Sequence, residues 1–139
     1  TKVAGASEEL QAAMGLARAE ALKLKLPVTI CARVGQTCGN ETSWNNGFLL
    51  FQDPNGNGQF DDDEIMLRTG AFDQATLLIT SEAGSISLLG NGRLAGGAQQ
   101  VFDIRGPNCT PGGTIGDNGK RRQLTITASG RASVRRTAC

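Results

Sequence analysis

The sequence predicts an α+β fold in which one long N-terminal helix packs on antiparallel β-sheets arranged in two layers. Apolar residues recur every three or four positions over residues 1–25, Pro27 ends this pattern, and short β-like segments separated by glycine turns follow. A length of 139 residues suits one domain with a core of its own. We therefore expect a single domain over 1–139, with a helix over 1–25 and a β-rich globular part over 26–139.

The N-terminal helix carries one apolar stripe, rich in alanine, which allows a close approach to a sheet. The helix should end at Leu26-Pro27, because proline lacks an N–H group and disfavours helical geometry at the residue before it. No convincing cap precedes the stripe at Thr1, so we expect a helix that has been cut from a longer one. The stripe consists of Val3, Ala6, Leu10, Ala13, Ala17, Ala21 and Leu24.

Eight short segments after Pro27 predict β-strands, and several of them alternate apolar and polar residues. Asn-Gly, Gly-Gly and Ser-Gly pairs between the segments are typical of turns. We expect two layers because a strongly twisted single sheet of this size tends to fold over, and we expect the longest irregular loop over 109–120. The predicted strands are Val28–Ala32, Gly47–Gln52, Ile65–Arg68, Thr76–Thr80, Ser85–Leu89, Gln99–Ile104, Arg122–Ala128 and Arg131–Arg136.

The chain has four cysteines, no histidine and no CxxC motif, which argues against a zinc site. An even number of cysteines, one of them the last residue, is typical of two disulfides formed in an oxidising compartment. Of the three pairings we predict Cys31–Cys38, which closes a turn around Gly35, and Cys109–Cys139, which ties down the end of the chain.

The residues required for most catalytic sites are missing. Without histidine, neither a Ser-His-Asp nor a Cys-His arrangement can form. Four of the acidic residues, 61–64, lie in one polar loop, whereas a paired-carboxylate hydrolase needs two acids in different environments. No glycine-rich segment combines a strand, a helix and a phosphate-binding lysine. We therefore predict no catalytic residue and no enzymatic activity.

Residues 53–64 match the twelve-residue calcium-binding loop, with oxygen donors at the ligand positions and Gly58 at the sixth position. The flanking residues 48–51 and 65–67 predict strands instead of the two helices of an EF-hand. A polar β-hairpin tip with Asn-Gly turns explains most of the same residues, so two interpretations remain, and calcium is the one cofactor that the sequence suggests. The candidate ligands are Asp53, Asn55, Asn57, Gln59, Asp61 and Glu64.

A net charge of +1 conceals a strong asymmetry along the chain. Residues 53–64 carry five acidic side chains and no basic one, whereas the last 20 residues carry six basic side chains and no acidic one. The basic end suits DNA phosphates or an acidic neighbouring subunit, although charge runs are more often simply solvated. No aromatic residue lies among these cations to stack on bases. They are Lys120, Arg121, Arg122, Arg131, Arg135 and Arg136.

Short motifs follow one another in a characteristic order from about Leu10 to the C-terminus. They are Ala17-Arg18-Ala19-Glu20-Ala21, Pro27-Val28-Thr29-Ile30-Cys31, Cys38, Trp44 with Gly47-Phe48, Phe51-x-Asp53-x-Asn55-Gly56, Gly92-Arg93-Leu94, Arg122-x-Leu124-x-Ile126 and Gly130-Arg131. Each motif alone is weak, but their order and spacing are specific. In this combination the chain resembles the type IV minor pilins and pseudopilins of the FimT, FimU and H-type pseudopilin family, and its cysteine pattern is most similar to FimU-type members.

The resemblance implies a pilin-like fold whose hydrophobic N-terminal helix is processed by a prepilin peptidase and inserted in the inner membrane. A missing membrane-inserted half would explain the uncapped Thr1. The implied location is the inner membrane with a periplasmic domain, and then the pilus at the cell surface. The implied function is a minor pilin that joins other minor pilins and the major pilin in a complex that primes pilus assembly and sits at the tip. One helix face is expected to pack on its own sheet below and on other pilins' helices toward the missing N-terminus; it consists of Val3, Leu10, Met14, Ala17 and Ala21.

Two alternatives come from the same resemblance. FimT-like members that bind DNA in natural transformation carry a Gly-Arg-x-Arg motif, whereas this chain has Ser133 where the second arginine is expected after Gly130-Arg131. Arg135 follows on the same face of the predicted strand. DNA binding is therefore one alternative, and an H-type pseudopilin of type II secretion is the other.

Overall fold

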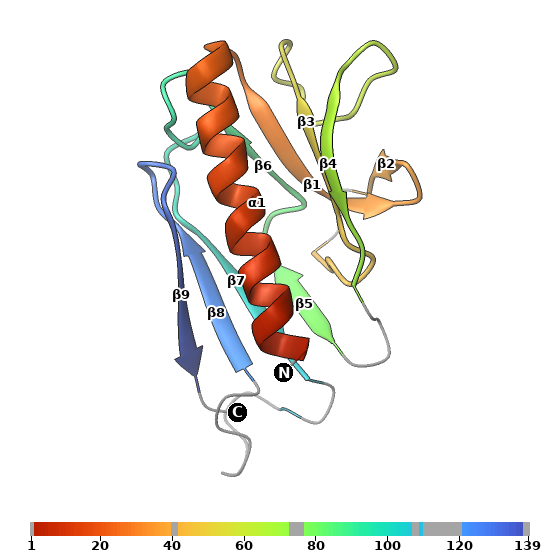
Figure 1. Cartoon of the computed structure of the whole chain (residues 1–139), viewed down its shortest axis with the longest axis vertical. Helices are drawn as coiled ribbons and strands as arrows, with labels where there is room; N and C mark the ends of the chain where they lie inside the picture. Colours follow the sequence, from red (N-terminus) through yellow and green to blue (C-terminus); the bar gives the residue numbers. More distant parts are fainter. Residues whose placement is uncertain (1, 40–41, 73–76, 107–108, 110–120, 138–139) are drawn as a thin grey trace.

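The computed structural model describes residues 2–39, 42–72, 77–106, 109 and 121–137. Its helix α1 (Lys2–Leu24) runs the length of the molecule along one side (Figure 1). The predicted helix is confirmed, and it ends where Lys25 adopts a left-handed conformation with a φ of 57° shortly before Pro27. Within the described residues, no helix combines the length and the apolar character needed to cross a membrane.

The first sheet is antiparallel and is built around β1 (Val28–Val34). This strand pairs with β3 (Phe48–Gln52), with β6 (Ser85–Leu88) and, at its C-terminal end, with the two-residue strand β2 (Thr37–Cys38). Strand β4 (Met66–Gly70) continues the sheet beyond β3. The connection from β3 to β4 passes through residues 53–65, so the acidic segment is the loop of a β-hairpin.

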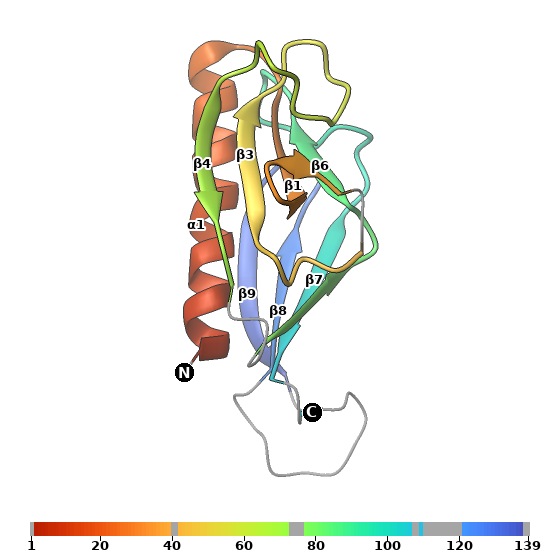
Figure 2. The same cartoon turned by 90° about the vertical axis from the view of Figure 1, so that its right-hand side faces the viewer.

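The second sheet is also antiparallel, with the strand order β5-β7-β8-β9. It contains β5 (Leu78–Ser81), β7 (Gln100–Arg105), β8 (Arg121–Ile126) and β9 (Ala132–Thr137). Figure 2 shows this sheet beside the first, with α1 along the left side of the view. The tight turn between β8 and β9 requires Gly130, which has a φ of 85° and whose Cβ would collide with the carbonyl oxygen of Gly92.

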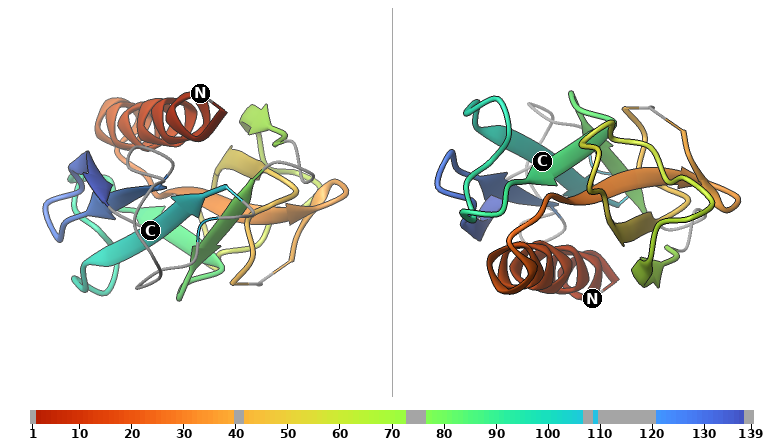
Figure 3. Two further views of the ribbon diagram at one scale, coloured as in Figure 1. Left: turned by 90° about the horizontal axis from the view of Figure 1, so that it is seen from below. Right: turned by 90° about the horizontal axis from the view of Figure 1, so that it is seen from above.

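Helix α1 lies across both sheets and covers one apolar core that they share (Figure 3). Each sheet turns alternate side chains toward the helix, such as Ile30 and Leu50 from the first and Phe102 and Leu124 from the second. The indole of Trp44 packs edge-on against the Phe102 ring with centroids 4.7 Å apart. The helix and the two sheets therefore stabilise one another through common contacts.

Each predicted strand has a counterpart among the observed ones. Strand β2 was not predicted because two residues carry no periodic signal. Gly47, which the sequence places in a strand, instead precedes β3 with a φ of 106°. Thr76, at the start of another predicted strand, lies outside the described residues, as does nearly all of the predicted loop over 109–120.

Candidate functional site

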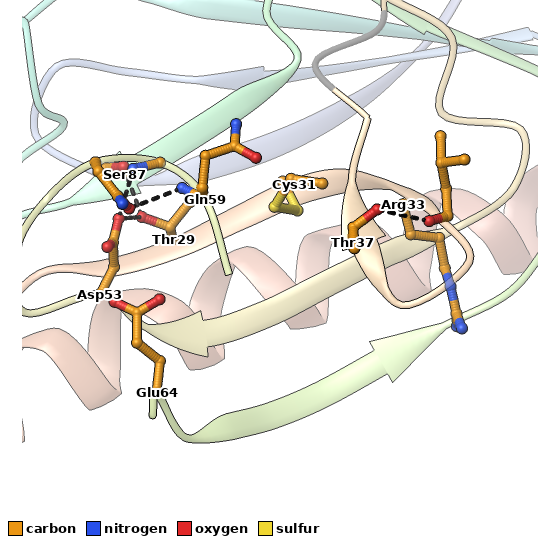
Figure 4. Close-up of a disulfide and its surroundings, with 12 residues drawn as sticks. Thr29, Cys31, Arg33, Thr37, Asp53, Gln59, Glu64 and Ser87 are labelled. Atoms are coloured by element: carbon orange, nitrogen blue, oxygen red, sulfur yellow. Dashed lines mark hydrogen bonds between the residues drawn. A yellow bond between two sulfur atoms is a disulfide. The ribbon is translucent and has the colours of Figure 1, made fainter. Parts of the chain in front are cut away.

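The acidic loop over 53–65 lies on the face of the first sheet opposite α1. A small second core joins the loop to this face, because Phe60 packs edge-on against Phe51 with ring centroids 5.3 Å apart. The predicted disulfide between Cys31 and Cys38 is confirmed, with a Cα–Cα distance of 5.6 Å, and it belongs to the same cluster (Figure 4). Residues 28–32 of β1 are thus buried on both faces of the sheet.

Asp53 is the first residue after β3 and is fully buried, with 0% of its surface exposed. Its Oδ2 accepts hydrogen bonds from the Thr29 hydroxyl at 2.7 Å and from the Gly58 backbone N–H at 2.9 Å. The Thr29 hydroxyl also shares a 2.7 Å hydrogen bond with the Ser87 hydroxyl on β6. The other carboxylate oxygen, Oδ1, is buried and has no hydrogen-bond partner.

Glu64 near the end of the loop is partly buried, and one of its carboxylate oxygens also lacks a partner. Its Oε1 accepts a hydrogen bond from the Asp61 backbone N–H at 2.8 Å, whereas its Oε2 is buried without a partner. Figure 4 shows the Glu64 carboxylate beside that of Asp53. Burial raises the pKa of Glu64, whereas the hydrogen bond from the Asp61 backbone N–H lowers it. A hydrogen bond with the Asp53 carboxyl group and the negative charges of Asp53 and Asp61 raise it further.

The remaining predicted ligands gather around Asp61. Its Oδ2 accepts hydrogen bonds from the side-chain amides of Asn55 at 3.0 Å and Asn57 at 2.9 Å. The backbone N–H groups of Asn57 and Gln59 in turn donate to the side-chain oxygens of Asn55 and Asn57, respectively. In the described part of the chain, no three acidic or cysteine side chains are placed to hold a metal by themselves.

Sequence analysis missed Thr29 and Ser87, the two hydroxyls that hold Asp53. Both point to the same side of the first sheet, where β1 and β6 pair with Thr29 opposite Ser87. Thr29 lies between the apolar residues Val28 and Ile30 in a buried strand. A hydroxyl group in such a strand is the signal that could have indicated a polar contact there.

The predicted basic set does not form one surface. The register pairs Arg122 with Arg136 and Gln123 with Arg135, so neighbouring arginines alternate between the two faces of the second sheet. Arg122 is 8% exposed and lies on the face that carries Leu124 and Ile126. Strand alternation therefore divides the described arginines between two faces, with Arg121 and Arg135 on one and Arg122 and Arg136 on the other. Contact of this set with DNA or a partner subunit stays a prediction, and Lys120 lies outside the described residues.

The arginines on the outer face of the second sheet are engaged within the domain. The Asp103 carboxylate forms ion pairs with Arg105 and with Arg121, the second at 2.7 Å. Arg135 donates two hydrogen bonds to the Gln123 side-chain oxygen, at 2.7 and 3.1 Å.

Arg131 lines a groove of about 430 Å³ between α1 and the β8–β9 turn.

The helix face predicted to pack on its own sheet and on other pilins is buried in this domain. Val3 is 5% exposed, and Leu10, Met14, Ala17 and Ala21 are fully buried against the two sheets. This burial agrees with the predicted packing on the sheet, and contacts of this helix with other pilins stay a prediction. The opposite face of α1, which includes Gly5, Ala12 and Ala19, is exposed.

The second predicted disulfide is described at one end. Cys109 is 3% exposed and is disulfide-bonded. Its predicted partner, Cys139, lies outside the described residues.

A long helix lying across two antiparallel sheets, with one helix face left uncovered, defines a pilin-like α+β protein. The chain belongs to the family of type II transport proteins described as GspH, whose family model matches residues 6–130. Its fold is similar to the crystal structure of the type IV minor pilin FimU of Pseudomonas aeruginosa, with a TM-score of 0.69 and 24% identity over 96% of this chain and 87% of that one.

A second crystal form of the same Pseudomonas aeruginosa FimU gives a TM-score of 0.65, with 24% identity over 94% of this chain and 90% of that one. No curated protein sequence matches this chain significantly.

Proposed function

We propose that this chain is a minor pilin, a non-enzymatic subunit that joins other minor pilins and the major pilin in the complex that primes type IV pilus assembly and sits at the tip. Membership of the GspH family and a fold similar to that of FimU support this proposal. In this proposal the protein is anchored in the inner membrane with its globular part in the periplasm, and it then enters the pilus.

The exposed face of α1 is the observation that carries the proposal. Gly5, Ala12 and Ala19 follow one another at intervals of seven residues and are all exposed. A Cβ at Gly5 would meet no atom within 4 Å, so nothing inside this domain requires glycine there, although glycine costs a helix about 1 kcal/mol relative to alanine. Small side chains allow two helices to approach closely, and neighbouring pilin helices are the partners we propose.

Enlarging one small side chain on this face tests the proposal. We expect Ala12→Leu, in the full-length protein, to reduce co-purification with the other minor pilins about tenfold or more and to reduce the number of pili in a strain that lacks the native gene. The matched control is Ala98→Leu, which adds the same atoms at an exposed loop position. If both variants of the 139-residue protein are as stable as the wild type, the Ala12→Leu change has altered the helix surface without disturbing the fold.

Wild-type pili in a deletion strain, together with no minor pilin recovered by the wild-type protein, would contradict the proposal. A second candidate function, an H-type pseudopilin of type II secretion, is favoured by the description of the matching family. The same deletion strain separates the two functions, because loss of secreted enzymes with normal pili supports the pseudopilin and the reverse supports the minor pilin.

A further inference from the structure

Two carboxylates meet in the acidic loop, and each has an oxygen without a partner. Asp53 Oδ1 is buried in a residue with 0% exposure, and Glu64 Oε2 is buried beside it. In the described part of the chain, neither carboxylate has a lysine or arginine partner. Two like charges this close in a buried position are unfavourable unless the two carboxyl groups share a proton or a cation balances them. We propose that residues 53–64 bind one calcium ion.

The positions of the unpartnered oxygens agree with an independent feature, the spacing of the loop. In the twelve-residue calcium loop the first and last ligands are carboxylates, and the last is a glutamate. Asp53 and Glu64 occupy these two positions, and the same two residues hold the unpartnered oxygens. Gly58, at the sixth position where the loop turns sharply, has a φ of 75°.

The intermediate ligand positions already converge on one carboxylate. Asn55 and Asn57 at positions three and five both donate to Asp61 at position nine. Their side-chain oxygens now accept the backbone N–H groups of Asn57 and Gln59, so both amide groups would have to turn toward the ion when it binds. The backbone carbonyl of Gln59 would supply position seven. The proposed ligand set is three carboxylates, two amide oxygens and one carbonyl. Among the described residues no three carboxylates surround one point, so Asp61 would have to move toward Asp53 and Glu64 when the ion binds.

This donor set favours calcium over magnesium. Calcium accepts six to eight oxygen ligands in a flexible arrangement, whereas magnesium requires a near-ideal octahedron and loses water reluctantly. The loop is also fixed to the sheet at two points, by the hydrogen bond from Thr29 to Asp53 and by the packing of Phe60 on Phe51. The proposed site is therefore partly organised, with β-strands where an EF-hand has helices. It does not depend on the proposed function.

Calcium titration of the 139-residue protein, first treated with EDTA, tests the proposal. We expect isothermal titration calorimetry to give one site with a dissociation constant on the order of 10⁻⁴ M, the range of extracellular calcium modules. At 10 mM calcium chloride the melting temperature should rise by roughly 5 °C or more, and 10 mM magnesium chloride should raise it far less.

Two variants make the test specific. Glu64→Gln removes the negative charge at position twelve and should weaken calcium binding about tenfold or more. Asp62→Asn removes the same charge at an exposed position of the loop that is not a ligand, and its affinity should stay within about twofold of the wild type.

The proposal would be overturned if calcium gave neither a heat of binding nor a change in melting temperature with the wild-type protein. It would also be overturned if magnesium raised the melting temperature as much as calcium, or if both variants weakened calcium binding equally. These measurements use the isolated domain, so their failure leaves the pilin proposal unaffected. Conversely, failure of the Ala12→Leu experiment leaves calcium binding unaffected.

Discussion

Thr29 connects three segments through one hydroxyl group. It donates to Asp53 at the end of β3 and shares a hydrogen bond with Ser87 on β6. Hydrogen bonds to charged groups contribute about 1.5 to 3 kcal/mol, more than those between neutral groups. A single side chain on β1 therefore holds the acidic loop to the sheet, and this loop is the proposed calcium site.

At the residue scale we predict that Thr29→Val lowers the free energy of unfolding by about 1 to 3 kcal/mol, because it removes this hydroxyl while keeping the branched shape. Urea denaturation followed by circular dichroism in the presence of EDTA gives the value. Thr69→Val on the exposed side of β4 is the control, and it should change stability by less than about 0.5 kcal/mol. Equal effects of the two variants would contradict the role assigned to Thr29.

Among the structural elements, the β1–β2 hairpin depends on a covalent link. Strand β2 has two residues and pairs with β1 at Arg33 and Val34. So short a strand adds few hydrogen bonds, and the Cys31–Cys38 disulfide spans the hairpin with a sequence separation of 7. The disulfide also covers the outer face of the first sheet together with Leu49 and Phe51. Its loss should affect the hairpin and this second core.

At the element scale we predict that Cys31→Ala with Cys38→Ala costs about 2 to 3 kcal/mol of stability, the chain-entropy value for a loop of this size. The change in urea midpoint, measured against the wild type without reductant, provides the test. Far-ultraviolet circular dichroism should still report the α1 signal, because the helix packs on the other face of the sheet. A midpoint shift equivalent to less than about 0.5 kcal/mol would contradict this prediction.

The turn between β8 and β9 allows a second prediction at this scale. Gly130→Ala should destabilise the protein more than Gly96→Ala. Both glycines have a positive φ, 85° and 81°, but a Cβ would collide with backbone only at Gly130, whereas Gly96 has no atom within 4 Å. The difference in melting temperature between the two variants gives the cost of the collision with Gly92, because the cost of a positive φ is common to both. An equal loss in melting temperature would show that the contact with Gly92 is relaxed without cost.

At the scale of the whole molecule, one core joins the helix to both sheets. Leu10 from α1, Ile30 from the first sheet and Ile104 from the second belong to the same cluster and are fully buried. Trp44 is also fully buried in this cluster, and its indole N–H donates to the Ala83 carbonyl oxygen at 3.0 Å. The fluorescence of Trp44 therefore reports on packing between the two sheets, while circular dichroism reports on α1.

We predict that the two signals change in one transition on unfolding, and that Leu10→Ala lowers stability by about 2 to 5 kcal/mol in both. Leu22→Ala makes the same chemical change on the helix surface, where Leu22 is 39% exposed, and should cost much less. Separate midpoints for fluorescence and circular dichroism would show that the helix and the sheets unfold independently.

The sequence by itself determined the elements of this protein, since periodicity is a local property. Neighbouring residues carry all of the signals that predicted these elements. The apolar spacing over 1–25 and Pro27 predicted the helix, the alternating segments predicted the strands, and the spacing of Cys31 and Cys38 predicted the disulfide.

Only the tertiary structure decided which surfaces remain free and which polar atoms lack partners. Strand pairing placed Arg122 and Arg135 on opposite faces, and the two sheets together covered the apolar stripe of the helix. The burial of Asp53 beside Glu64 likewise depends on contacts between segments far apart in the chain, such as the hydrogen bond from Thr29. Local spacing carries no information on such pairings, because they depend on strand register and on packing across the whole fold.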